Sequence, residues 1–173
     1  MNVLAGFKKI RAFVFDVDGV LTDGSLLVMD NGQLVRRMNI KDGYALQLAV
    51  KQGYEILVIS GGNSEAVRQR LEKLGVHEVH MNIVNKKDVL TRFVTDKQLK
   101  WEEVLYMGDD IPDLEVMHLS GLPCCPADAV QEIRAVSHFI SQIPGGQGCV
   151  REVIEKVLRL QGKWNHDVTV PSK

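Results

Sequence analysis

The chain has 173 residues, of which 45% are hydrophobic and 25% charged, and its formal net charge is −1. This length is typical of one domain, and the balanced charge predicts no nucleic-acid partner. No apolar stretch approaches the roughly 20 residues that span a bilayer, so we expect no membrane partner either. The three cysteines follow no CxxC spacing, which favours reduced thiols and a cytoplasmic location.

Apolar runs and helical patterns alternate along the chain. We expect strands over residues 11–17, 54–60, 77–83, 102–110, 121–127 and 138–141. We expect helices over residues 41–53, 63–75, 86–99, 112–121, 128–136 and 148–161. Strands that alternate with helices join through right-handed crossovers into a parallel sheet. The predicted fold is therefore α/β, a three-layer α/β/α arrangement of Rossmann type. It forms one domain over residues 1–162, followed by a polar tail over 163–173.

One segment, residues 25–39, interrupts this alternation. It has two strand-like arms around Asn31-Gly32, and an Asn-Gly pair between such arms is a strong hairpin signal. An isolated hairpin is only marginally stable in water. The apolar side chains that this hairpin would expose are Leu26, Val28, Leu34 and Met38. We therefore expect an inserted β-hairpin that packs against copies of itself in an oligomer.

Two groups of acidic residues follow predicted strands. Asp16 and Asp18 come directly after the first strand, and Asp109, Asp110 and Asp113 follow a later one. Residues two apart in extended backbone point the same way, and parallel sheets bind ligands beyond the carboxyl ends of their strands. Neighbouring carboxylates repel unless a cation lies between them, and carboxylate and carbonyl oxygens suit Mg²⁺. Each aspartate alone is consistent with a turn or a helix cap, but two groups at two strand ends favour a metal site.

Two further features suit a bound phosphate. Ser60, Gly61 and Gly62 end a predicted strand just before a helix begins, and backbone amides at such a position bind anions. Lys86 opens another helix, where a positive charge is unfavourable to the helix dipole. The alternative for Lys86 is an exposed charge without a specific role. A carboxylate nucleophile, a cation site, a hydroxyl donor and a lysine at one crevice together favour phosphoryl transfer, in which the protein mainly positions groups and neutralises charge.

The same motifs occur in a recognisable order. DVDGV at 16–20, Ser60, Lys86 and GDDIPD at 108–113 resemble the four motifs of the haloacid dehalogenase superfamily of phosphatases. The resemblance covers the whole globular chain. It implies the three-layer fold of that superfamily, with the hairpin of residues 25–39 in place of a cap domain.

The resemblance also implies a role for each motif residue. Asp16 would be the nucleophile that forms an aspartyl-phosphate, and Asp18 would be the acid–base group. The implied contacts to the phosphoryl group are Ser60, Gly61 and Lys86. The implied ligands of Mg²⁺ are Asp16, Asp18 through its carbonyl, Asp109 and, in support, Asp110.

Further segments narrow the resemblance. NIKDGY at 39–44 and GGQGCVREV at 145–153 resemble the branch that acts on 3-deoxy-D-manno-octulosonate 8-phosphate in lipopolysaccharide synthesis. This implies a small phosphorylated sugar acid as substrate and a homotetramer in which Arg70 reaches the substrate carboxylate across a subunit interface. The implied sugar contacts are Asn39, Lys41, Asp42 and Gly43. The alternatives are a solvated helix face for Arg70 and a helix-capping turn for the 39–43 segment.

Two positions depart from the branch pattern. Gly62 and Gln47 stand where relatives carry long polar side chains. The identity of the sugar in the substrate is therefore left open. A nonulosonate 9-phosphate is therefore an alternative substrate. An alternative of another class is a non-catalytic Mg²⁺-binding scaffold, or a receiver-type signalling domain. The scaffold alternative would require the loss of Asp16 or Asp18, and both are present.

Overall fold

The computed structural model describes residues 2–165 and 167–171. Within this part of the chain, six strands form one parallel sheet in the spatial order β5-β4-β1-β6-β7-β8. Their bounds are β1 Ala12–Phe15, β4 Glu55–Ile59, β5 Glu78–His80, β6 Val104–Met107, β7 Leu122–Cys125 and β8 Phe139–Ile140. Phe15 at the end of β1 pairs with Val58 of β4 and Met107 of β6. The loops that carry the three main predicted motifs therefore leave the sheet side by side.

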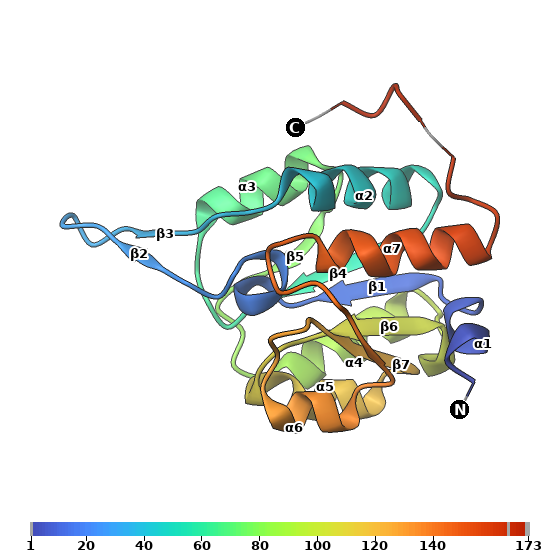
Figure 1. The fold of residues 1–173 in the computed structure, drawn as a ribbon. Coiled ribbons are helices and arrows are strands. Elements are labelled where there is room, and N and C mark those ends of the chain that lie inside the picture. The colour runs from blue at the N-terminus through green and yellow to red at the C-terminus, as the bar shows by residue number, and fades with distance from the viewer. Residues whose placement is uncertain (1, 166, 172–173) are drawn as a thin grey trace.

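Helices cover both faces of this sheet. Their bounds are α1 Val3–Phe7, α2 Ile40–Lys51, α3 Glu65–Lys73, α4 Lys86–Asp96, α5 Leu114–Leu119, α6 Gln131–Val136 and α7 Cys149–Leu160. Figure 1 shows α2, α3 and α7 on one face and α4, α5 and α6 on the other. Along β1, Phe13 and Phe15 join the core under the first group of helices, whereas Ala12 and Val14 join the core under the second. This alternation follows from the two-residue period of a strand, and the predicted three-layer α/β class is confirmed.

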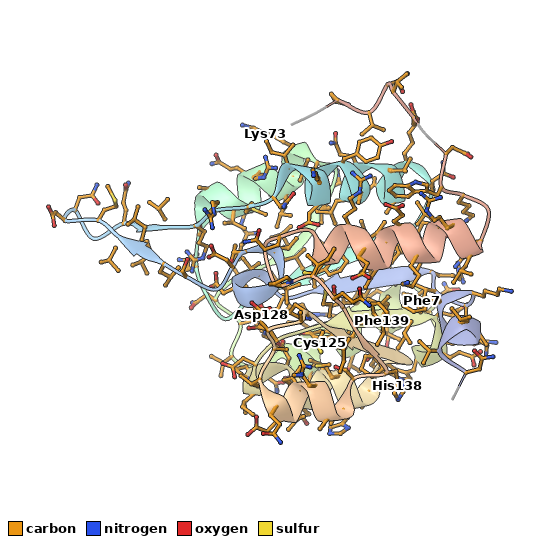
Figure 2. The ribbon with its side chains drawn as sticks, in the orientation of Figure 1. Phe7, Lys73, Cys125, Asp128, His138 and Phe139 are labelled. Atoms are coloured by element: carbon orange, nitrogen blue, oxygen red, sulfur yellow. The ribbon has the colours of Figure 1, made fainter. Side chains whose placement is uncertain are left out.

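The short helix α1 was not expected from the sequence. The Asn2 side chain caps α1 by accepting a hydrogen bond from the Leu4 amide at 3.1 Å. Phe7 at its end is buried and meets Phe139 of β8 edge to face, with ring centroids 5.3 Å apart (Figure 2). A helix of five residues is too short to show a helical period, so the sequence carries little signal for it.

The predicted hairpin is present and projects away from the sheet (Figure 1). Its strands β2 Leu27–Val28 and β3 Leu34–Val35 pair antiparallel, and they are shorter than the predicted arms. Gly32 in the turn has φ +81°, a conformation that glycine adopts without steric cost. The expectation of exposed apolar side chains holds at Val28, which is 70% exposed, but it is wrong for Met38. Met38 is partly buried against the main core, because its segment forms a bridge with Thr22 beside the sheet.

The described part of the polar tail lies against α2. Lys51 forms an ion pair with Asp167 at 2.5 Å, and the Gln47 amide donates to the Pro171 carbonyl at 2.9 Å. Trp164 packs against the core. The division into a domain over 1–162 and a tail over 163–173 stays a prediction. Among the described residues, no helix has the length and apolar character that crossing a membrane requires.

Candidate active site

The site begins at Asp16, directly after β1. The Asp16 Oδ1 accepts a hydrogen bond from the Val17 amide at 2.7 Å and so caps the tight helical turn Val17–Leu21. Gly19 within this turn has φ +87°, and a Cβ there would lie 1.9 Å from a carboxylate oxygen of Asp109. The residue must be glycine because the backbone after β1 passes directly against the acidic loop after β6.

Three carboxylates meet where these two loops touch. One oxygen from each of Asp16, Asp109 and Asp113 lies within 4.8 Å of the others. Burial, together with the charge of Asp113, raises the pKa of Asp16 to about 7. Burial and the charge of Asp16 raise the pKa of Asp109 to about 8. The protein alone therefore does not hold all these groups ionised at neutral pH, and a cation among them would reverse this.

The donor atoms fit a hard divalent cation. The Asp109 Oδ1 is buried and accepts no hydrogen bond from the described part of the protein. A buried anionic oxygen without a partner is costly, and a ring of carboxylate oxygens is the ligand set that Mg²⁺ prefers. Asp110 lines the same cavity at its rim and is exposed, and its Oδ1 accepts from the Ile111 amide at 2.8 Å.

Asp113, the third acidic residue after β6, is fully buried. Its Oδ1 accepts from the Lys86 ammonium at 2.7 Å and from the Tyr106 hydroxyl at 2.6 Å. Its Oδ2 accepts from the Asp109 amide at 3.1 Å. Both oxygens are thus engaged by the protein, so we assign Asp113 to orienting Lys86 and the Asp109 loop. The position of Asp113 in GDDIPD could have indicated this role from the sequence. Nothing in the sequence indicated that Tyr106 is its hydrogen-bond partner.

Lys86 is buried, which shows that the alternative of a solvent-exposed charge is wrong. Its ammonium lies 3.1 Å from the Asp16 Oδ2 and 2.7 Å from the Asp113 Oδ1, and its side chain is 4% exposed. Burial lowers the pKa of Lys86, but the charges of Asp113 and Asp16 outweigh this and the net shift is upward. Lys86 therefore carries a permanent positive charge beside the Asp16 carboxylate.

These groups surround one cavity of about 520 Å³. Its lining includes Asp16, Asp18, Ser60, Gly61, Lys86 and Asp109. The Ser60 Oγ accepts a hydrogen bond from the Gly62 amide at 3.1 Å, so its proton is available to an anion in the cavity. The cavity thus combines a cation site, a lysine and a hydroxyl donor around the Asp16 carboxylate.

Asp18 has a partner that the sequence analysis missed. Arg36, just after β3 of the hairpin, donates from Nε to the Asp18 Oδ1 at 2.7 Å and from Nη2 to the Oδ2 at 3.1 Å. A charged residue at the end of an apolar hairpin arm was the only available signal. The pairing depends on how the base of the hairpin lies against the loop after β1, which local sequence does not specify.

Comparison with known proteins agrees with this geometry. The 3-deoxy-D-manno-octulosonate 8-phosphate phosphatase KdsC of Escherichia coli (strain K12) is 33% identical over 162 residues, which are 94% of this chain and 86% of that protein. The crystal structure of the Yersinia pestis phosphatase of the same name superimposes with a TM-score of 0.91 at 30% identity, over 93% of this chain and 87% of that one. The chain belongs to the 3-deoxy-D-manno-octulosonate 8-phosphate phosphatase family. This confirms the resemblance to the haloacid dehalogenase superfamily.

A second solved member of the octulosonate 8-phosphate phosphatase family shows what that relative binds. The Moraxella catarrhalis enzyme, crystallised with a magnesium ion, a phosphate ion and a KDO molecule, superimposes with a TM-score of 0.90 at 30% identity. The alignment covers 94% of this chain and 93% of that one. No protein-family profile matches the chain.

In this member of the octulosonate 8-phosphate phosphatase family, the 39–43 segment lies apart from the catalytic cavity. None of its residues is among those that line the cavity in the described part of the chain. Asn39 caps α2 by accepting from the Lys41 amide at 2.8 Å, and Lys41 is exposed. Asp42 is buried and accepts from the Arg151 amide at 2.7 Å. Within one chain this segment therefore has the hydrogen bonds of a helix cap, made by Asn39, and its contact with a sugar stays a prediction.

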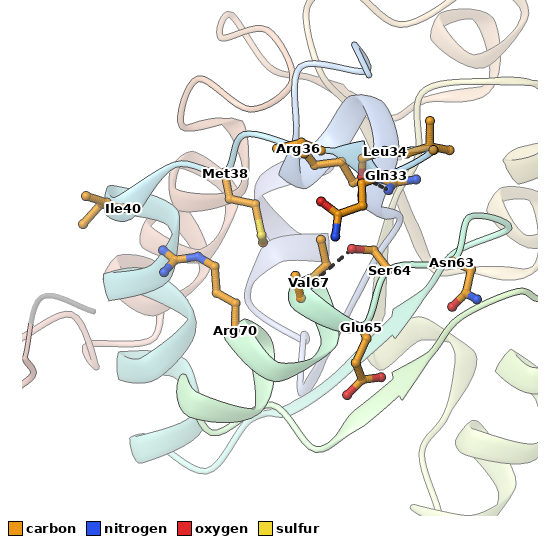
Figure 3. A pocket seen from close by; sticks show the side chains of 13 residues that line it. Gln33, Leu34, Arg36, Met38, Ile40, Asn63, Ser64, Glu65, Val67 and Arg70 are labelled. Carbon is orange, nitrogen blue, oxygen red and sulfur yellow. Dashed lines mark hydrogen bonds between the residues drawn. The ribbon is translucent and has the colours of Figure 1, made fainter. Parts of the chain in front are cut away.

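Arg70 lines a second, larger groove of about 700 Å³. Figure 3 shows this groove between the hairpin arm that carries Arg36 and Met38 and the helix α3 that carries Val67 and Arg70. Gly43 leaves room for Arg70, because a Cβ at position 43 would lie 3.3 Å from its Nη2. Arg36 borders this groove and also binds Asp18 of the catalytic cavity, so the two spaces adjoin in this member of the family.

Proposed function

We propose that this protein is a Mg²⁺-dependent phosphatase that hydrolyses 3-deoxy-D-manno-octulosonate 8-phosphate, within lipopolysaccharide precursor synthesis. The observation that carries the proposal is the cluster of Asp16, Asp109 and Asp113 with the buried Lys86, of which Asp16, Lys86 and Asp109 line one cavity. Family membership supports the substrate.

The first half of the reaction transfers phosphate to Asp16. The carboxylate of Asp16 attacks phosphorus, a P–O bond to Asp16 forms, and the P–O bond to the sugar breaks. Asp18 donates its proton to the departing sugar oxygen, which leaves poorly as an alkoxide. Proton transfer of this kind typically contributes about 10²–10⁴-fold to the rate. Lys86 and the Ser60 hydroxyl bind the phosphoryl oxygens and offset the repulsion between two anions.

The second half returns Asp16 to its starting state. A water molecule attacks the phosphorus of the aspartyl-phosphate, and Asp18, now ionised, takes the water proton. The new P–O bond forms as the P–O bond to Asp16 breaks, and inorganic phosphate leaves. Asp18 regains in this step the proton that it gave up in the first.

The residues that would hold Mg²⁺ are Asp16, Asp109 and the backbone carbonyl of Asp18, with Asp110 at the rim of the same cavity. When bound, the cation neutralises charge on the phosphoryl group. Asp113 holds Lys86 and the Asp109 amide in place, as its hydrogen bonds indicate. The unpartnered Asp109 Oδ1 supports this assignment.

A substrate panel tests the proposal. Phosphate release would be measured with and without Mg²⁺ from octulosonate 8-phosphate, a nonulosonate 9-phosphate and a hexose phosphate. We expect Mg²⁺-dependent release with a preference for the octulosonate, and loss of turnover in Asp16→Asn with an unchanged fold. Preference for the nonulosonate would keep the mechanism and change the pathway. No release from any ester would favour a non-catalytic scaffold.

We also propose a homotetramer that assembles through the hairpin of residues 25–39. The support is a cluster of exposed apolar side chains on an element that touches little of its own chain. These residues are Leu26, Leu27, Val28, Met29, Leu34 and Val35. Light scattering on wild type and on Leu27→Lys/Val28→Lys tests this, because two charges there should yield a smaller species. A wild-type monomer at micromolar concentration would contradict the proposal.

A cytoplasmic location is part of the same proposal. The cysteines Cys124, Cys125 and Cys149 are buried and form no disulfide within the described chain, as expected in a reducing compartment. Cell fractionation with an antibody against the protein would test the location directly.

A further inference from the structure

We propose that Arg36 of the hairpin is a positioning residue for Asp18, so that the hairpin takes part in catalysis as well as in assembly. The inference rests on the proposed function, in which Asp18 gives and takes a proton. It assigns to Arg36 the task of fixing the Asp18 carboxylate in the orientation that reaches the water or the leaving oxygen.

The contact between the two residues is a two-point ion pair. Nε and Nη2 of Arg36 face the two oxygens of Asp18 at 2.7 and 3.1 Å. A planar guanidinium that binds both oxygens fixes the plane of the carboxylate, which a single contact or a lysine does not. The side chain of Arg36 is 4% exposed and that of Asp18 is 32% exposed. Arg36 is therefore enclosed, while Asp18 keeps access to the catalytic cavity that it lines.

Gly62 provides an independent observation. A Cβ at position 62 would lie 2.9 Å from the Arg36 Nη2 and 2.9 Å from the Asp18 Oδ2. Gly62 is not among the glycines with positive φ, so its backbone conformation does not require glycine. The guanidinium and carboxylate ends occupy part of the volume that a side chain at position 62 would fill, so they would have to shift to admit one. Gly62 therefore leaves the space in which Arg36 and Asp18 pair.

The chemistry gives this arrangement a measurable consequence. Transfer of phosphate from an ester with a good leaving group needs no proton from Asp18. Hydrolysis of the aspartyl-phosphate still needs Asp18 to take the water proton. If Arg36 orients Asp18, its loss slows the second step selectively, and the phosphorylated enzyme accumulates. A residue that only tethers the hairpin would not slow one half of the reaction and spare the other.

The test uses the full-length enzyme with Mg²⁺ and p-nitrophenyl phosphate. Steady-state kcat and KM, the fraction of enzyme trapped as phosphoprotein, and the thermal unfolding midpoint are measured for each variant. The variants are Arg36→Gln, Arg36→Lys, Gly62→Ala and Asp18→Asn. The matched control is Arg37→Gln, because Arg37 is the next residue and forms an ion pair of 2.7 Å with Asp23, but its side chain is 79% exposed.

We expect Arg36→Gln to lower kcat about tenfold or more, within the range that acid–base groups contribute. KM should fall with kcat and kcat/KM should stay within about twofold, because only the step after phosphate transfer is slowed. Phosphoprotein should accumulate in Arg36→Gln, as we also expect for Asp18→Asn. Gly62→Ala should reproduce this pattern because its methyl group displaces the pair. Arg36→Lys should recover part of the loss, and Arg37→Gln should behave as wild type.

Three results would overturn the inference. A raised KM without phosphoprotein would make Arg36 a substrate contact. A lowered unfolding midpoint with equal loss in Arg36→Gln and Arg36→Lys, again without phosphoprotein, would make it a structural tether. Wild-type kinetics in Arg36→Gln would give it no role. After any of these three results the proposed function still stands, as long as wild type hydrolyses the ester and Asp18→Asn traps phosphoprotein. An inactive wild type would overturn both the proposed function and the inference.

Discussion

Asp42 offers a stability prediction that can be worked out from the structure. It lies in the first turn of α2, yet its Oδ1 accepts a hydrogen bond from the Arg151 amide in the first turn of α7 at 2.7 Å. The cap position of α7 is Gly148, which has no side chain to accept from the first amides. Asp42 therefore caps α7 from a neighbouring helix. Its other oxygen, Oδ2, is buried and accepts no hydrogen bond from the described residues.

Burial makes the charged form of Asp42 unfavourable. It raises the pKa of Asp42 from 3.8 to about 6, although the Arg151 amide and charge oppose the shift. Because the folded protein binds this proton more tightly than the unfolded chain, stability falls as the pH rises from about 4 to about 6. At roughly 1.4 kcal/mol per pH unit, this difference corresponds to an order of 3 kcal/mol, which is an upper bound.

Asp42→Asn isolates this contribution. The amide oxygen of the new side chain can still accept from the Arg151 amide, but the buried charge is gone. We expect the Asp42→Asn variant at pH 8 to be more stable than wild type by about 1–3 kcal/mol, and the difference to shrink towards zero near pH 4. Asp42→Ala is the matched control. It removes the acceptor as well and should lower the stability near pH 4 by about 1–3 kcal/mol. At pH 8 the removal of the buried charge offsets this loss, so Asp42→Ala should stay below Asp42→Asn by about the same amount at both pH values.

The assay is urea unfolding at a fixed protein concentration with EDTA, at several pH values between 4 and 8. The acidic cluster at the active site also titrates, but it is common to wild type and variant and cancels in their difference. A difference between wild type and Asp42→Asn that does not change with pH would refute the reasoning. The proposed contact of Asp42 with the sugar is checked separately, by KM of the same variant.

Three further predictions concern the active site. Magnesium binding should release protons below about pH 8 and weaken as the pH falls. The pKa values of Asp109 and Asp16 are raised to about 8 and about 7, and both groups must ionise to bind the cation. Titration calorimetry in two buffers of different ionisation enthalpy would detect the released protons, and binding without proton release would contradict the prediction. Gly19→Ala should lower Mg²⁺ affinity and cost about 1–2 kcal/mol of stability, since its φ is +87° and its Cβ would strike Asp109; unfolding with and without Mg²⁺ measures both effects. Arg70→Ala should impair turnover of carboxylate-bearing substrates more than that of p-nitrophenyl phosphate, and an equal loss on both esters would indicate a structural role.

Sequence reasoning located the strands and the site because both depend on local patterns. The buried strands read as continuous apolar runs, and Asp16 and Asp109 follow two of them. Since parallel strands end at one edge of the sheet, the two residues could be expected to meet before any coordinates were known. The Asn31-Gly32 turn likewise needs a backbone conformation that few residues adopt, so it marks the hairpin unambiguously.

Other features escaped because they depend on contacts between distant segments. Asp42 caps α7 from a neighbouring helix, and sequence does not show this because the direction of a side chain depends on how two helices pack. The expected contact of the 39–43 segment with the sugar stays a prediction. Met38 was expected in solvent, but it packs on the core. In the sequence, nothing distinguishes Arg36 from a surface arginine, because its contact with Asp18 depends on where the base of the hairpin lies beside the loop after β1.

The sequence by itself determined the alternation of strands and helices, the end of the sheet that carries the chemistry, and the acidic and basic groups available there. Those properties follow from hydrophobic period, chain direction and residue type, each of which is local. The tertiary structure alone decided which carboxylate receives Lys86, which arginine holds Asp18, and why position 62 is a glycine. Such pairings are set by distances between segments that the sequence separates, so they appear only when the chain is packed.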